Sequence, residues 1–256
     1  STAVGLAAGG YIPFANSFAK FLARGYDQIE MATITRANIK LVGSHAGVSL
    51  AADGPSQMGL PDVAFFRSFA TVDDGQGRPA CLFFQPADAV AACRLTELMA
   101  NHQGMCYMRT HRPDVPIIYS DQTRFRIGGC NQLAEGDAAT LVAAGYMVGV
   151  ALEAVKRLAE QGLRCALFDA YSFPLNGEPI LSCAEKTNGR ILTIEDNYSG
   201  GLDAEVARLA AARPDLTVQS VTCSRIPKSA KTPAEMLRFL SLSVDDIAAR
   251  VYAMVR

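Results

Sequence analysis

The hydrophobic positions in the first half of the chain alternate between helical spacing and short runs typical of strands. Residues 39–42, 81–84 and 105–108 are largely apolar runs bordered by Gly or Pro, which predicts three strands. Asp88 is placed to cap a helix that continues to about Asn101. An amphipathic helix is predicted where six apolar side chains recur every three or four residues: Phe14, Phe18, Phe21, Leu22, Tyr26 and Ile29.

The second half has a clearer repeating order of strand and helix. Residues 139–144 and 165–168 predict strands, and between them lies a helical pattern over 148–161 that Gly162 ends. A strand, a helix and a strand at this spacing form a βαβ unit, which requires a parallel sheet. Further elements are expected at 190–195 (strand), 203–212 (helix), 216–221 (strand) and a last helical region that begins with the capping box of residues 232–235.

Between the two halves, residues 112–135 are rich in Pro, Gly and polar side chains. This composition predicts a crossing between two domains. We therefore expect an α/β protein with two doubly wound domains and mostly parallel sheets. The expected boundaries are a first domain at 1–118, a linker at 119–135 and a second domain at 136–256.

Composition excludes several classes of function. The formal net charge of the 256 residues is −1, and no basic stripe is present, so a nucleic-acid partner is not expected. No apolar stretch is long enough to cross a bilayer, and no leader segment is recognisable. The seven cysteines are widely spaced and form no C-x-x-C pair, so neither a zinc site nor a disulfide framework is indicated. We expect reduced cysteines in a cytoplasmic protein.

The loop from Gly43 to Gly59 is the first candidate for chemistry. It follows a predicted strand, which is where open α/β sheets place ligand contacts. His45, Asp53 and Gln57 supply hydrogen-bond donors and acceptors that suit a polyhydroxylated ligand. A structural loop whose polar side chains bind its own backbone is an equally good interpretation from the residues alone.

A second candidate follows the strand at 105–108. Arg109, His111 and Arg112 would suit a phosphate, since guanidinium groups match phosphate geometry with paired donors. A solvated basic turn is the better interpretation of this segment alone, and an apolar stripe such as Phe14, Phe18 and Phe21 is more often core than cofactor platform. The residues by themselves indicate a sugar-like or phosphorylated ligand, without a reaction.

At these segments the sequence resembles the transketolase family. The similarity covers the loop from His45 to Met58 and the preceding segment 18–29, which looks like a helix of the family's pyrimidine-binding domain. It continues from the first residue to the last helical region. Further matching segments, in order along the chain, are residues 65–68, 85–88, 109–113, 189–196 and 200–201.

The resemblance implies a thiamine-diphosphate pyrimidine-binding domain followed by a transketolase C-terminal domain. Phe18 and Phe21 would then flank the aminopyrimidine ring of thiamine diphosphate, reversing the core interpretation. His45 and Asp53, the candidate catalytic residues, would bind hydroxyls of the ketose donor. Gln57 and Arg112 would also hold the substrate, with Arg112 on the sugar phosphate. The implied reaction moves a two-carbon ketol unit from a ketose phosphate to an aldose, as in the pentose phosphate pathway.

The sequence departs from the family pattern in several places. The Glu that hydrogen-bonds the aminopyrimidine would lie a few residues before Ser1, and we expect it in a preceding stretch. Ala51 and Ala52 stand where many members have Gly and Glu, and residues 73–78 look like an insertion. The family's diphosphate-binding domain is not recognisable. Either a separate subunit carries that domain, or the chain is a fragment that has lost it. We expect the first, with the Mg²⁺ ligands on the N-terminal diphosphate-binding subunit of an α2β2 assembly and no metal ligands in this chain.

Two alternatives stay open at this point. The β subunit of a 2-oxo-acid dehydrogenase has the same two domains, although its hydrophobic substrates give little use for the polar side chains at 45, 53, 57 and 112. A catalytically inactive transketolase-like paralogue would keep the fold and the interface without the reaction.

Overall fold

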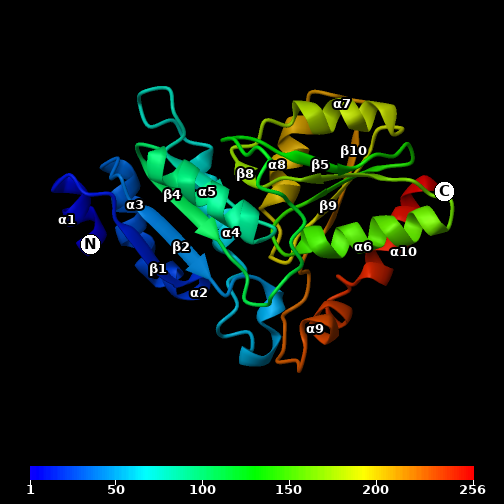
Figure 1. Cartoon of the computed structure of the whole chain (residues 1–256), viewed down its shortest axis with the longest axis horizontal. Helices are drawn as coiled ribbons and strands as arrows, with labels where there is room; N and C mark the ends of the chain where they lie inside the picture. The colour runs from blue at the N-terminus through cyan, green and yellow to red at the C-terminus, as the bar shows by residue number, and fades with distance from the viewer.

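The computed structural model describes residues 1–256 and contains two α/β units side by side (Figure 1). The first unit is built on a five-stranded sheet in which four strands are parallel and the edge strand β8 is antiparallel to β3. Its strands, in spatial order, are β1 (Phe14–Phe18), β2 (Lys40–Ser44), β4 (Met105–Arg109), β3 (Cys81–Phe84) and β8 (Ser172–Phe173).

The second unit repeats this plan, again with one antiparallel strand at an edge of the sheet. Three parallel pairings join its first four strands, and β5 runs antiparallel to β7. Its strands, in spatial order, are β10 (Thr217–Val221), β9 (Arg190–Ile194), β6 (Thr140–Ala143), β7 (Ala166–Asp169) and β5 (Asn131–Ala134). The α/β class and the mostly parallel sheets predicted from the sequence are confirmed.

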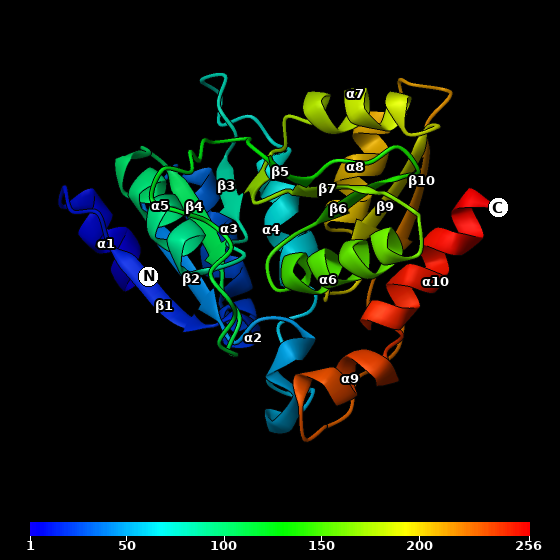
Figure 2. The same ribbon diagram turned by 45° about the vertical axis from the view of Figure 1, so that its right-hand side comes forward.

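Helices flank both sheets, as the turned view shows (Figure 2). The first unit carries α1 (Thr2–Ala8), α2 (Ala19–Leu22), the 3₁₀ helix η1 (Ala23–Gly25), α3 (Tyr26–Ile34), the 3₁₀ helix η2 (Val48–Asp53), α4 (Asp62–Ala70) and α5 (Ala89–Asn101). The second unit carries α6 (Met147–Glu160), α7 (Glu178–Lys186), α8 (Leu202–Ala210), α9 (Pro233–Phe239) and α10 (Val244–Val255).

The single helix predicted from the apolar spacing between Phe14 and Ile29 is wrong. Its first five residues form β1, which pairs with β2 in parallel register from Phe14 opposite Lys40 to Phe18 opposite Ser44. Pairing with a neighbouring strand satisfies the backbone groups of this segment, so tertiary context overrides a weak local preference. Within this segment, helical structure begins only at Ala19 and continues as the consecutive helices α2, η1 and α3.

Asp88 caps α5 as predicted, and it also holds the chain that leaves the first unit. Its Oδ1 accepts a hydrogen bond from the Ala91 amide at 2.8 Å. Its Oδ2 accepts from the amides of Ile118 and Tyr119 at 2.8 and 2.9 Å. One buried carboxylate therefore satisfies three backbone donors and fixes where the connecting segment starts.

The two units share secondary structure as well as a boundary. Strand β8 belongs to the sequence of the second unit but completes the sheet of the first. Strand β5 lies within the segment expected to be a linker and joins the second sheet. The chain therefore crosses between the units more than once, which ties them together through backbone hydrogen bonds.

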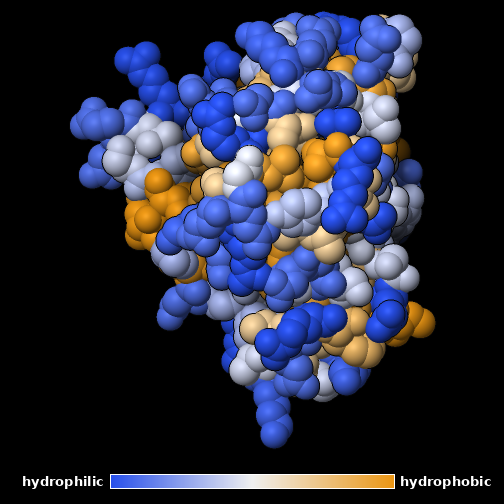
Figure 3. All heavy atoms as spheres, turned by 90° about the vertical axis from the view of Figure 1, so that its right-hand side faces the viewer, coloured by the Kyte–Doolittle hydropathy of each residue, from blue (hydrophilic) through white to orange (hydrophobic).

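The outer face of the second unit is covered mainly by hydrophilic side chains, with apolar groups in a band between them (Figure 3). No helix is both long and apolar enough to cross a bilayer. All seven cysteines are free, and four of them, Cys81, Cys106, Cys165 and Cys223, are buried.

A buried acid anchors the connecting segment to the second sheet. Asp169, at the end of β7, has no exposed surface and accepts a hydrogen bond of 2.7 Å from the Tyr119 hydroxyl. Burial raises the pKa of this carboxyl from its ordinary value of 3.8 to about 8, with the Tyr119 bond opposing that rise. The folded protein therefore holds Asp169 as a neutral acid near pH 7.

We predict that Asp169→Asn removes a pH dependence of stability. Because the folded pKa is raised above the unfolded one, the contribution is fully present below about pH 4 and is lost as the pH rises through about 8. Across this window the unfolding free energy of the wild type should fall relative to that of the variant by up to about 1.4 kcal/mol per pH unit. Urea unfolding of both proteins at several pH values measures the difference.

The matched control is Asp137→Asn, which changes an exposed carboxylate paired with Arg164. It should follow the wild-type profile between about pH 5 and about pH 8. A profile of Asp169→Asn parallel to that of the wild type would contradict the assignment of a neutral buried acid.

Candidate functional site

The candidate residues gather at the edge of the first sheet where its parallel strands end. Phe18 is the last residue of β1, His45 directly follows β2, and Arg112 lies three residues beyond the end of β4. The carboxyl ends of parallel strands meet at one edge of a sheet, which is where α/β folds bind ligands. The topology therefore brings together segments that are far apart in the sequence.

Three aromatic rings are stacked at this edge. The His45 ring lies over Phe18 with centroids 3.9 Å apart and an angle of 12° between the planes. Phe21 is parallel to Phe18 at 5.2 Å and 1°. Both Phe side chains are half-buried, so they are not part of the core that the apolar spacing alone favours.

His45 is held in an unusual backbone conformation. Its φ of +55° lies in the left-handed region, which non-glycine residues rarely adopt. Its Nδ1 is 3.0 Å from the hydroxyl of Ser44, and Ser44 Oγ in turn lies 3.4 Å from the carbonyl of Ser17. The ring is therefore oriented by Phe18 stacked against its face and by the Ser44 hydroxyl beside its Nδ1.

Asp53 and Arg112 form the second group. Arg112 Nη1 donates to Asp53 Oδ1 at 2.8 Å, and the side chains are 48% and 29% exposed. Gln57 is half-buried in the same loop, and its backbone amide donates to the carbonyl of Gly54. Since the pair is accessible to water, its net contribution to stability is about 0–1 kcal/mol, and it can open for a ligand.

The aromatic pair fits a planar heteroaromatic ring such as the aminopyrimidine of thiamine diphosphate. Phe18 and Phe21 are parallel and partly open to solvent. The guanidinium of Arg24 lies 4.9 Å over Phe21, but this exposed side chain is long and can move aside. No group of three or more His, Cys, Asp or Glu side chains is placed to hold a metal ion.

Arg109, grouped by sequence with His111 and Arg112, faces the protein interior and cannot hold a phosphate. Its Nε donates to Asp62 at 3.1 Å and its Nη1 to Asp196 at 2.8 Å. Burial opposes its charge, yet Asp196 and Asp62 together raise the pKa of the guanidinium. Sequence reasoning missed this cluster because Asp62 and Asp196 are 47 and 87 positions away from Arg109.

His111 is half-buried and packs against the second unit. Its ring meets Tyr146 of the second unit edge-on, with centroids 5.6 Å apart. Burial lowers the pKa of His111, so the neutral imidazole is the form present near pH 7. Of the three basic residues at and beyond the end of β4, only Arg112 is exposed at the site.

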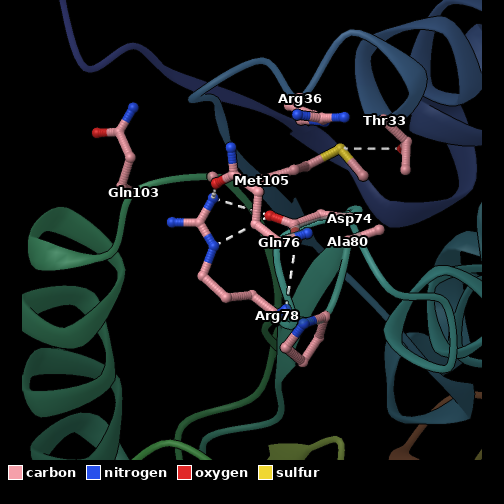
Figure 4. A pocket seen from close by; sticks show the side chains of 10 residues that line it. Thr33, Arg36, Asp74, Gln76, Arg78, Ala80, Gln103 and Met105 are labelled. Atoms are coloured by element: carbon pink, nitrogen blue, oxygen red, sulfur yellow. Dashed lines mark hydrogen bonds and ion pairs between the residues drawn. The ribbon is translucent and has the colours of Figure 1, made fainter.

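The segment that looks like an insertion lies at the opposite edge of the sheet. Asp74 and Arg78 form an ion pair of 2.8 Å within it, and the turn borders a pocket with Arg36, Gln103 and Met105 (Figure 4). Strands β2, β3 and β4 begin at this edge, so the turn is remote from the candidate site.

Residues 1–117 match the model of the transketolase pyrimidine-binding domain, and residues 128–247 match that of the transketolase C-terminal domain. The chain is 39% identical over 248 residues to the transketolase of Rattus norvegicus and 38% identical to that of Homo sapiens, covering 95% of this chain in each case. It spans 38% of the length of both relatives.

Solved structures agree with the sequence matches. A split-gene transketolase, described as an inactive β4 tetramer, superposes with a TM-score of 0.85 at 30% identity and covers 99% of this chain and 80% of that chain. The transketolase of Campylobacter jejuni has the same fold, with a TM-score of 0.75 at 18% identity over 95% of this chain and 36% of that one. With both domains matched in order, the chain belongs to the transketolase family and contains its pyrimidine-binding and C-terminal domains.

Proposed function

We propose that this chain is the C-terminal half of a transketolase that transfers a two-carbon ketol unit from a ketose phosphate to an aldose. The observation that carries the proposal is the joint placement of an aromatic stack and an exposed Arg–Asp pair at one sheet edge. The stack of Phe18, Phe21 and His45 suits a planar cofactor ring, and the pair of Asp53 and Arg112 suits a sugar with an anionic end.

A separate N-terminal chain completes the enzyme in this proposal. The chain spans 38% of the length of its full-length relatives, and its split-gene neighbour is described as an inactive β4 tetramer. The partner would carry the diphosphate-binding domain and the Mg²⁺ ligands. The α2β2 assembly and the cytoplasmic location expected from the sequence are part of the same proposal.

Each site residue has a role that its surroundings permit. Phe18 and Phe21 would hold the aminopyrimidine ring of thiamine diphosphate, which supplies an electron sink when bound. His45 would bind a donor hydroxyl through the ring nitrogen that does not face Ser44. Asp53 accepts hydrogen bonds from a second hydroxyl, and Gln57 can donate and accept beside it.

Arg112 would hold the phosphate end of the sugar. Only its Nη1 is engaged by Asp53, so the Nε and Nη2 donors remain to form a charge-assisted fork with a phosphate. A 2-oxo-acid substrate has less use for the polar side chains of His45, Asp53, Gln57 and Arg112. We therefore prefer a sugar phosphate.

The direct test is a coupled assay of this chain mixed with its partner subunit, thiamine diphosphate and Mg²⁺ over a panel of ketose phosphates. We expect turnover in the mixture and none from this chain alone. Co-purification should recover the partner. Failure of any partner to restore turnover, with the chain isolated as a well-behaved monomer, would contradict the proposal and favour an inactive paralogue.

We predict that Arg112→Ala raises the KM for phosphorylated donors about tenfold or more, with a smaller effect on kcat. Loss of a charge-assisted bond costs about 1.5–3 kcal/mol of binding, and the reacting carbons lie at the other end of the sugar. Arg164→Ala, on the exposed surface of the second unit, is the control and should match the wild type. Equal effects on phosphorylated and unphosphorylated sugars would exclude the phosphate role.

We predict that His45→Ala lowers kcat/KM for the ketose donor by about tenfold or more, because one hydrogen bond to the sugar is lost. His45→Asn is the matched variant, since Asn tolerates a φ of +55° and keeps a polar side chain, so it should lose less. Steady-state kinetics with a fixed acceptor measures both. Unchanged donor kinetics in the Ala variant would refute the role of His45.

A further inference from the structure

The loop that carries the candidate sugar contacts is packed into the core of the second unit. Although the loop leaves from β2, its apolar side chains cluster largely with those of the second unit. One buried cluster contains Val48, Leu50, Met58 and Leu60 together with Leu192, Ile194, Val221, Met236 and Leu237 of the second unit. The loop is therefore a shared element, with its polar side chains at the site and its apolar ones held by the other domain.

Asp196 contacts the start of this loop. Gly47 has a φ of +72°, and a Cβ built there would overlap the Asp196 carboxylate, so only glycine admits this close approach. The Gly47 amide donates to the carbonyl of Gly59 at 2.9 Å, and Arg109 donates to that same carbonyl at 3.2 Å. Since Arg109 is also paired with Asp196, one carboxylate of the second unit restrains both ends of the loop.

A second contact from the other domain holds the middle of the loop. The Ala230 amide donates to the carbonyl of Ala51 at 3.2 Å, and the Ser229 hydroxyl would be 2.6 Å from a Cβ at Gly54. Helix α9, which follows this segment, lies beside η2 in both ribbon views (Figures 1 and 2). Asp53, the last residue of η2, is positioned by these neighbours.

The loop needs such support because its backbone is strained. His45 and Ala51 have φ values of +55° and +45°, and each such residue costs on the order of 1–3 kcal/mol. Conformations of this kind persist only where the surroundings over-determine them. Contacts from the second unit begin two residues after His45 and include the carbonyl of Ala51 itself.

We infer that Asp196 and Ala230 are positioning residues that hold the sugar-binding loop in its productive shape. This inference rests on the proposed function for what the loop binds. It gives a defined role to the C-terminal domain, which carries none of the proposed substrate contacts. Without the contacts from these residues, the loop from His45 to Gln57 relaxes and the donor binds less well.

The test is hydrogen–deuterium exchange of the isolated chain, compared between the wild type and Asp196→Asn. We expect amides in residues 44–60 to exchange about tenfold faster in the variant, with α6 and α7 unchanged. In the assembled enzyme the same variant should raise the KM for the ketose donor more than it lowers kcat. Asp137→Asn, an exposed carboxylate of the same domain, should change neither quantity.

Unchanged exchange in the loop, or exchange that rises equally over the whole chain, would overturn the inference. Ala230→Pro removes the backbone amide that donates to the carbonyl of Ala51, and it should speed exchange mainly in residues 51–57. Wild-type rates there would overturn the role of Ala230. Exchange is measured without substrate, so its result does not depend on whether the enzyme transfers a ketol unit. If only the positioning role is wrong, the variants exchange at the wild-type rate while the wild-type assembly still turns over.

Discussion

The central interaction between the two domains is that of the Arg109 guanidinium, which lies between a carboxylate of each. Asp62 comes from the start of α4 and Asp196 lies two residues beyond the end of β9, so the pair of contacts joins the carboxyl edges of both sheets. Breaking a buried ion pair by removing one partner costs about 3–5 kcal/mol, because the remaining charge is left without compensation. The Tyr107 hydroxyl adds a donor to Asp62 at 2.8 Å, which helps to satisfy the excess negative charge.

This arrangement explains how the two domains contribute to one candidate site in different ways. The first sheet presents the side chains proposed to contact cofactor and sugar, while the second fixes the backbone that carries them. Strand β8 and the shared core of residues 48–60 make the same connection by other means. In the proposed enzyme, the chain supplies one half of the active site and a partner supplies the diphosphate and metal side.

Much of the fold could be predicted because its strands are apolar runs between breakers. The strands at β2, β3 and β4, the βαβ unit around α6 and the cap at Asp88 are all local signals, and the structure confirms them. The segment from Phe14 to Ile29 was predicted incorrectly, because its apolar spacing suits a helix while its first residues pair with β2 as a strand. Strand β8 has only two residues, too few for any periodicity.

The candidate site was harder to predict for a related reason. His45, Asp53 and Arg112 could be proposed from their positions after strands, and Phe18 and Phe21 only from the family resemblance. Arg109 has the same local setting as Arg112, yet it points inward because its partners lie on α4 and after β9. Which of two neighbouring arginines serves a ligand is decided by tertiary contacts, and no local pattern carries that information.

The most direct measurement is calorimetric unfolding of the wild type and of Arg109→Met. If the buried guanidinium joins the two domains into one cooperative unit, the wild type unfolds in a single transition with equal calorimetric and van't Hoff enthalpies. The variant should then unfold at a lower temperature, because Asp62 and Asp196 are left buried without a cation between them. A variant that still unfolds at the wild-type temperature would contradict this account.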